Sequence, residues 1–78
     1  MIDLKETLSD IARSIVNNPD SVNVTVAEDS NSITLTLTVD ADDMGMVIGR
    51  HGKIAKAIRT VIKAAASGSG KKVNVEIR

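Results

Sequence analysis

No cysteine and no aromatic residue occurs in this 78-residue sequence, which also has a single proline and a single histidine. The absence of cysteine excludes a disulfide framework and a thiolate metal site. One histidine without a nearby carboxylate is a poor basis for a metal centre, so we expect neither a metal nor another cofactor. Because Phe, Trp and Tyr are missing, the core must be built from aliphatic side chains, and no aromatic platform can stack on a planar ligand.

Long apolar runs are also missing, and no stretch of the sequence could span a bilayer. Met1–Glu6 alternates apolar and charged residues, unlike the basic start and apolar run of a signal peptide. We therefore expect a cytoplasmic protein without membrane contacts. A chain this short buries only about 60% of its unfolded surface and cannot divide its core, so residues 1–78 are predicted to form a single domain.

Charge is balanced over the whole chain but divided along it. The formal net charge of zero argues against a nucleic-acid partner, because domains that bind nucleic acids are usually basic. Residues 1–46, however, carry two basic side chains against nine acidic ones, a net charge of −7. Residues 47–78 carry eight basic side chains against one acidic one, a net charge of +7. A fold that keeps the basic half together would present one positive face.

Hydrophobic periodicity predicts the elements of the first half. Apolar residues from Leu4 to Val16 follow the spacing of an amphipathic helix, which Pro19 and the residues around it bring to an end. Residues 22–26 and 33–39 then alternate apolar and polar side chains on either side of a turn-prone polar segment. This arrangement is typical of an antiparallel hairpin of two half-buried strands.

Two helices and a strand are predicted in the second half. Asp40 is expected to cap a short helix that Gly49 ends, and a third helix begins after Gly52. The buried stripe of that helix is predicted to consist of Ile54, Ile58, Val61, Ile62 and Ala65. Alternation in residues 73–77 predicts a last strand. The order α-β-β-α-α-β indicates the α+β class, with a three-stranded sheet and helices packed on one face.

Three smaller expectations concern the second helix. Asp42 and Asp43 are placed in its first turn, where carboxylates favour the positive end of the helix dipole. Gly45 is interpreted as a glycine required by packing, and Met44 and Met46 as residues that fill gaps in the core rather than ligands.

The segment Gly49-Arg50-His51-Gly52 is the most informative motif. Glycine at both ends lets the backbone approach a phosphodiester closely, because no Cβ stands between the chain and the ligand. The start of the third helix adds unpaired N–H groups and a positive dipole end. Arg50, His51 and the following Lys53 add side-chain donors. These features together predict a clamp for a sugar-phosphate backbone.

The residues Ile48–Ile54, which read Ile-Gly-Arg-His-Gly-Lys-Ile, resemble the I-G-x-x-G-x-x-I core of a KH domain. The predicted element order resembles the type II, prokaryotic form. The similarity continues through Asp43–Gly45, residues 54–61 and residues 72–77. It covers nearly the whole chain and resembles small bacterial single-KH proteins of the KhpA type.

The resemblance implies a non-catalytic RNA-binding protein that holds about four nucleotides of single-stranded RNA through the G-x-x-G loop. The family also suggests roles such as RNA chaperone or post-transcriptional regulator, and single-stranded DNA is a second ligand to consider. The implied RNA-binding residues are Gly49, Arg50, His51, Gly52, Lys53 and Lys56 around the loop, with Ile48, Ile54, Leu35 and Leu37 lining an apolar groove for the bases. Protonation of His51, whose side chain ordinarily titrates near ~6.5, would strengthen binding at mildly acid pH.

Other functions are compatible with parts of the sequence. A protein-interaction module is the main alternative, in which the KH-like fold pairs as a homodimer or as a heterodimer with another RNA-binding protein. Pairing would also raise the avidity of a small RNA site. Gly68-Ser69-Gly70-Lys71 invites comparison with a phosphate-binding loop, but the spacing and the order of elements are wrong for that motif. No residue is predicted to be catalytic, because His51 lacks an evident orienting partner.

Overall fold

The first helix, α1, spans Leu4–Ile15 in the computed structural model, which describes residues 3–78. The Asp3 side chain caps it by accepting a hydrogen bond of 3.1 Å from the backbone N–H of Glu6. The helix ends four residues before Pro19, as the periodicity predicts. Met1 and Ile2, which begin the N-terminal segment interpreted above, lie outside the described residues.

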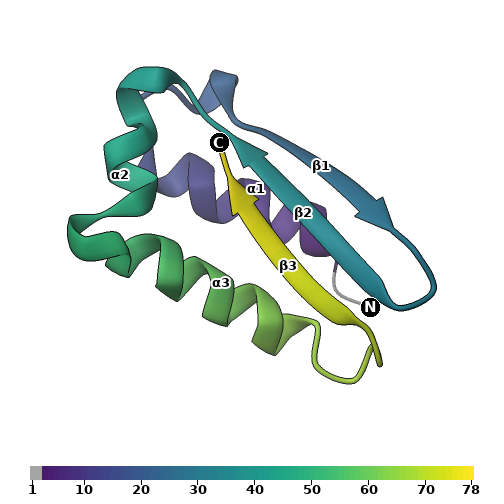
Figure 1. Ribbon diagram of the computed structural model, residues 1–78. Helices are drawn as coiled ribbons and strands as arrows, with labels where there is room; N and C mark the ends of the chain where they lie inside the picture. The colour runs from purple at the N-terminus through teal and green to yellow at the C-terminus, as the bar shows by residue number, and fades with distance from the viewer. Residues whose placement is uncertain (1–2) are drawn as a thin grey trace.

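Three strands form one sheet in the order β1-β2-β3 (Figure 1). They are β1 at Asn23–Glu28, β2 at Ser32–Thr38 and β3 at Lys72–Ile77. β1 and β2 pair antiparallel with Val24 opposite Leu37, which confirms the predicted hairpin. β2 and β3 pair parallel with Leu35 opposite Val75, so the chain crosses over through two helices between them.

The turn of the hairpin is organised by Asp29. Its carboxylate accepts hydrogen bonds of 2.7 Å from the backbone N–H groups of Asn31 and Ser32, and a third from the Ser32 hydroxyl. The two backbone hydrogen bonds, from Asn31 and Ser32, are the main reason that the pKa of Asp29 lies below its usual range. The charged carboxylate therefore holds the turn that sets the β1–β2 register.

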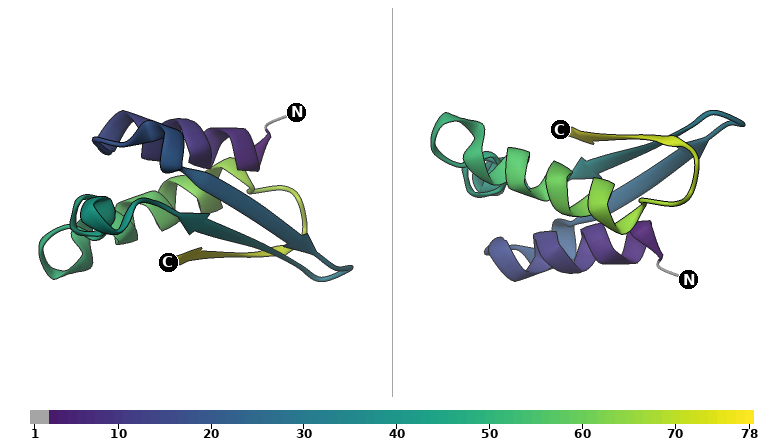
Figure 2. Two further views of the ribbon diagram at one scale, coloured as in Figure 1. Left: turned by 90° about the horizontal axis from the view of Figure 1, so that it is seen from above. Right: turned by 90° about the horizontal axis from the view of Figure 1, so that it is seen from below.

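Two helices connect β2 to β3. A 3₁₀ turn at Ala41–Asp43 leads into α2 at Met44–Ile48, and α3 follows at Lys53–Ala65. Figure 2 shows α1 and α3 side by side on one face of the sheet, and the opposite face carries the polar side chains of the strands. The order α-β-β-α-α-β, the α+β class and the helices on one face are as predicted. Within residues 3–78, no helix is both long and apolar enough to cross a membrane.

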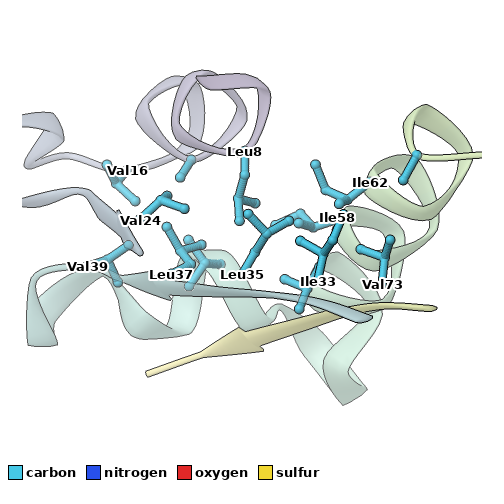
Figure 3. Close-up of a cluster of buried hydrophobic side chains, with 14 residues drawn as sticks. Leu8, Val16, Val24, Ile33, Leu35, Leu37, Val39, Ile58, Ile62 and Val73 are labelled. Carbon is cyan, nitrogen blue, oxygen red and sulfur yellow. The ribbon is translucent and has the colours of Figure 1, made fainter. Parts of the chain in front are cut away.

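The core lies between the sheet and the helices (Figure 3). Leu35 and Leu37 of β2 meet Leu8 of α1 and Ile62 of α3, and all four side chains are inaccessible to solvent. The predicted stripe on α3 is only partly correct. Its buried side chains are Ala55, Ile58, Ile62 and Ala66, whereas Ile54 and Val61 are exposed. The buried face of α3 is therefore rotated away from Ile54 and Val61, toward Ala55 and Ala66.

Two expectations about α2 are also corrected. An added Cβ at Gly45 would meet no atom within 4 Å, so packing does not require glycine there. Met46 is more than a third exposed and fills no gap in the core. Val47 is the one fully buried residue of this short helix, and Met44 is partly buried against the core, as predicted.

Candidate nucleic-acid interface

The loop between α2 and α3 has an unusual backbone. Gly49 ends α2 at φ +75° and ψ 174°, and Gly52 precedes α3 at φ +73° and ψ 14°. His51 lies between them at φ 58° and ψ 25°, the one non-glycine residue of the described chain with a positive φ. Strain of this kind is concentrated at functional sites. A 3.2 Å hydrogen bond from the N–H of Gly52 to the carbonyl of Gly49 closes the loop.

The two glycines of the loop have different roles. A Cβ at Gly49 would lie 2.6 Å from Cγ1 and 2.9 Å from Cβ of Ile54, so this glycine is needed for contact between the loop and α3. A Cβ at Gly52 would meet nothing within 4 Å. The left-handed backbone of Gly52 favours glycine, but no neighbouring atom among the described residues would clash with a side chain there. Open space beside the backbone is what a closely approaching ligand requires.

Polar and apolar side chains surround this loop. Arg50, His51 and Lys53 are exposed, and within residues 3–78 their side chains donate no hydrogen bond to the protein. Ile48 and Ile54, which flank the motif, are 39% and 36% exposed. The structure therefore brings cationic donors and two accessible apolar side chains together around Gly49–Gly52.

Leu35 and Leu37 do not belong to this surface. Both were expected to line the apolar groove, but their side chains have no solvent exposure. They point from the central strand into the core, beneath α1 and α3 (Figure 3). The alternation of β2 correctly predicts that they face the helices, and the helices cover them completely. A base could reach them only if the core opened.

Positive charge continues from the loop along α3. This helix contains Lys53, Lys56, Arg59 and Lys63 and no acidic residue. Arg59 is anchored to β3 by a 3.2 Å hydrogen bond from its Nε to the carbonyl of Val75. The flank of α3 that faces the free edge of the sheet is therefore basic.

Sequence reasoning missed a contact that supports α2. Asp43, only 1% exposed, accepts hydrogen bonds from the backbone N–H of Asn18 at 3.0 Å and from its side-chain amide at 3.1 Å. These bonds tie the connection after α1 to the start of α2. In the sequence, Asp43 is one of several carboxylates near the start of a predicted helix. No local pattern relates it to Asn18, which lies 25 positions earlier.

Proteins of one family are similar to this chain over nearly its whole length. The family model described as KhpA/KhpB, KH domain, matches residues 5–77. A protein of Clostridium acetobutylicum named RNA-binding protein KhpA is 54% identical over 74 residues, which cover 95% of this chain and 99% of the relative. A protein of the same name from Caldanaerobacter subterraneus subsp. tengcongensis is 49% identical over 72 residues, which cover 92% and 96% of the two chains.

Solved structures share the fold at lower identity. One is Era in complex with MgGDPNP and nucleotides 1506–1542 of 16S ribosomal RNA, with a TM-score of 0.64 and 20% identity over 95% of this chain. Another is a variant of Aquifex aeolicus Era bound to GDP and AlF4⁻, with a TM-score of 0.60 and 18% identity. This chain spans 28% and 31% of those two chains. On the evidence of the family model and of relatives that match over nearly their full length, the chain belongs to the KhpA/KhpB family of KH domains.

Proposed function

We propose that this protein binds single-stranded RNA through the loop Gly49–Gly52, without a catalytic step. The observation that carries this proposal is Gly52, whose left-handed backbone has open space where a side chain would be, next to the exposed residues Arg50 and His51. A phosphate can reach the loop there, and Arg50, His51 and Lys53 supply donors around it. Ile48 and Ile54 offer apolar contacts for the bases, and such a loop holds about four nucleotides in this fold.

The names of the similar proteins support the same ligand. The relatives from Clostridium acetobutylicum and Clostridium perfringens are called RNA-binding proteins, at 54% and 53% identity. Era was solved with a segment of ribosomal RNA. The loop contacts phosphates, and a phosphate clamp alone does not distinguish RNA from DNA. A regulatory or chaperone role would use this binding to alter the pairing or the accessibility of an RNA.

A charge-reversal pair tests the loop. We expect Arg50→Asp/His51→Asp to abolish binding to short single-stranded RNA while far-UV circular dichroism stays that of the wild type, because both side chains are exposed. The matched control is Arg13→Asp/Ser14→Asp, which makes the same charge change on two exposed residues of α1. Equal losses in the two variants would indicate a general charge effect, and unchanged binding in the loop variant would contradict the proposal.

A second candidate function, pairing with another protein chain, is favoured by a different face of α3. Ala57, Val61 and Ala64 are exposed and follow helical spacing, and Val61 is 49% exposed. We propose that this apolar stripe pairs with a second copy or with another RNA-binding protein, which would raise avidity for RNA. Sedimentation equilibrium tests self-pairing: Val61→Asp should be monomeric at concentrations where the wild type associates. A monomeric wild type would exclude the homodimer.

A further inference from the structure

We propose a second RNA contact at the far end of α3, in the segment of residues 67–72, which we call the distal loop. This proposal rests on RNA binding at Gly49–Gly52 and extends it. The distal loop joins α3 to β3 and lies at the opposite end of α3 from the G-x-x-G loop (Figure 1). With 13 residues and a rise of about 1.5 Å per residue, α3 separates the two loops by about 20 Å.

The distal loop borders an open pocket that three lysines help to line. Its volume is about 320 Å³, and the lysines are Lys63 from α3, Lys71 from the loop and Lys72 at the start of β3. Lys71 forms an ion pair with Glu28 of β1, which attaches the loop to the hairpin. Within residues 3–78, neither Lys63 nor Lys72 forms an ion pair, so their charges are available to a ligand.

Two backbone N–H groups of the same loop have no hydrogen-bond partner among the described residues. Gly68 and Gly70 adopt φ values of +93° and +77°. The N–H groups of Ser69, Lys71 and Lys72 are all hydrogen-bonded within the protein. Among the described residues, no hydrogen bond uses the N–H groups of Gly68 and Gly70. Unpaired backbone N–H groups are donors that an anion such as phosphate can use.

Basic side chains connect the two loops. Lys56 and Lys63 are seven residues apart on α3 and therefore lie on the same flank, about 10 Å from each other along the helix. Arg59, anchored to the edge strand, lies between them. The one carboxylate of β3, Glu76, is paired with Arg78. A polyanion leaving the G-x-x-G loop therefore meets positive charge along the whole of α3.

This continuity identifies the ligand as a nucleic-acid strand. A free phosphate or a mononucleotide would need only the distal loop, and the basic flank of α3 would have no part in its binding. A strand longer than about four nucleotides leaves the first loop with unbound phosphates. The basic flank and the distal loop are positioned to receive them.

The five glycines of the chain provide a direct assay. Gly49 and Gly52 report on the first loop, Gly68 and Gly70 report on the distal loop, and Gly45 lies within α2 and belongs to neither. In ¹H–¹⁵N spectra, we expect RNA of about four nucleotides to shift the Gly49 and Gly52 amides alone. RNA about three times as long should also shift Gly68 and Gly70. Distal shifts with the short RNA, or with inorganic phosphate at matched ionic strength, would instead indicate a simple anion site.

Salt dependence tests the energetics of the distal loop. Each lost phosphate contact lowers the slope of log K against log salt by about 0.7 for a single strand, so Lys63→Gln/Lys72→Gln should lower it by about 1.4 with long RNA. The corresponding loss of affinity is about tenfold at physiological salt. Binding of the short RNA should not change. Arg13→Gln/Ser14→Glu, which alters the charge of α1 equally, is the control and should leave both affinities unchanged.

The outcomes separate this inference from the proposed function. If the wild type binds neither RNA, the proposed function fails. If it binds both RNAs and the lysine variant binds long RNA with the same affinity and slope as the wild type, the distal contact is refuted while the first loop stands. A selective loss with long RNA supports both.

Discussion

Alanine at Gly49 should destabilise the fold far more than alanine at Gly52, although both glycines belong to one exposed loop. Gly49 lies at φ +75° and ψ 174°, a region that is essentially restricted to glycine and raises the energy of other residues by about 1–3 kcal/mol. Its new Cβ would also lie 2.6 Å from Cγ1 of Ile54. Moving that side chain or the start of α3 adds about 1–3 kcal/mol. We therefore expect a total loss of about 2–6 kcal/mol.

The expected loss at Gly52 is smaller, because its backbone is left-handed helical and its surroundings are open. Alanine in this conformation is disfavoured by about 1–2 kcal/mol, and the lower entropy of the unfolded chain offsets part of that. We expect a net loss of about 1 kcal/mol. RNA binding by the folded Gly52→Ala protein should nevertheless fall strongly, since the new methyl group occupies the space through which a phosphate approaches.

Urea denaturation followed by far-UV circular dichroism measures the stabilities, and fluorescence anisotropy with labelled RNA measures binding. Gly45→Ala is the control, because this glycine has ordinary backbone angles and no neighbour within 4 Å of an added Cβ. It should gain about 0.5 kcal/mol from better helix propensity. If Gly52→Ala proved less stable than Gly49→Ala, or bound RNA as tightly as the wild type, the distinction between the two glycines would be wrong.

Three further predictions concern other residues. Asp43→Ala should destabilise the fold by about 1–3 kcal/mol in urea denaturation, because both hydrogen bonds that its carboxylate accepts from Asn18 are lost. Asn18→Ala should have a smaller effect, since the backbone N–H of residue 18 remains bonded to Asp43. Because the pKa of Asp29 is lowered in the folded protein, its contribution to the free energy of unfolding is complete at pH values above the ordinary pKa of Asp. That contribution is lost as the pH falls through the pKa of the folded state. Asp29→Asn should therefore reduce the dependence of the free energy of unfolding on pH at acid pH. His51→Gly should stabilise the fold by about 1 kcal/mol in the same assay, because it relieves a positive φ; unchanged stability would show that the residue is not strained.

The element order and the sheet were predictable because they depend on patterns that packing preserves. The alternation of Ile33 to Val39 and the break at Pro19 are local signals, and the structure retains both. The motif residues Gly49–Gly52 were predictable for the same reason, since glycine spacing between two helices is visible in sequence. Leu35 and Leu37 show the limit: alternation indicates which face they occupy, but only the placement of α1 and α3 decides that this face is sealed.

The orientation of α3 could not be derived from periodicity alone. Ile54, Ile58, Val61 and Ile62 fall within an arc of about 100°, which one face of a helix can bury, so periodicity predicts that all four face the core. The buried face is instead rotated toward Ala55 and Ala66, and Ile54 and Val61 are left exposed. The Asp43 to Asn18 contact is likewise invisible in sequence, because it depends on tertiary proximity between two loops.

The rotation of α3 allows its two flanks to bind different partners. Val61 and Lys63 are two residues apart, and at about 100° per residue they project from nearly opposite sides of the helix. RNA following Lys56 and Lys63 toward the distal loop would therefore leave Val61 free to contact a second chain. If both proposals hold, Val61→Asp should leave the affinity of one chain for short RNA intact and Lys63→Gln/Lys72→Gln should leave self-association intact. Loss of both properties in either variant would show that the flanks are not independent.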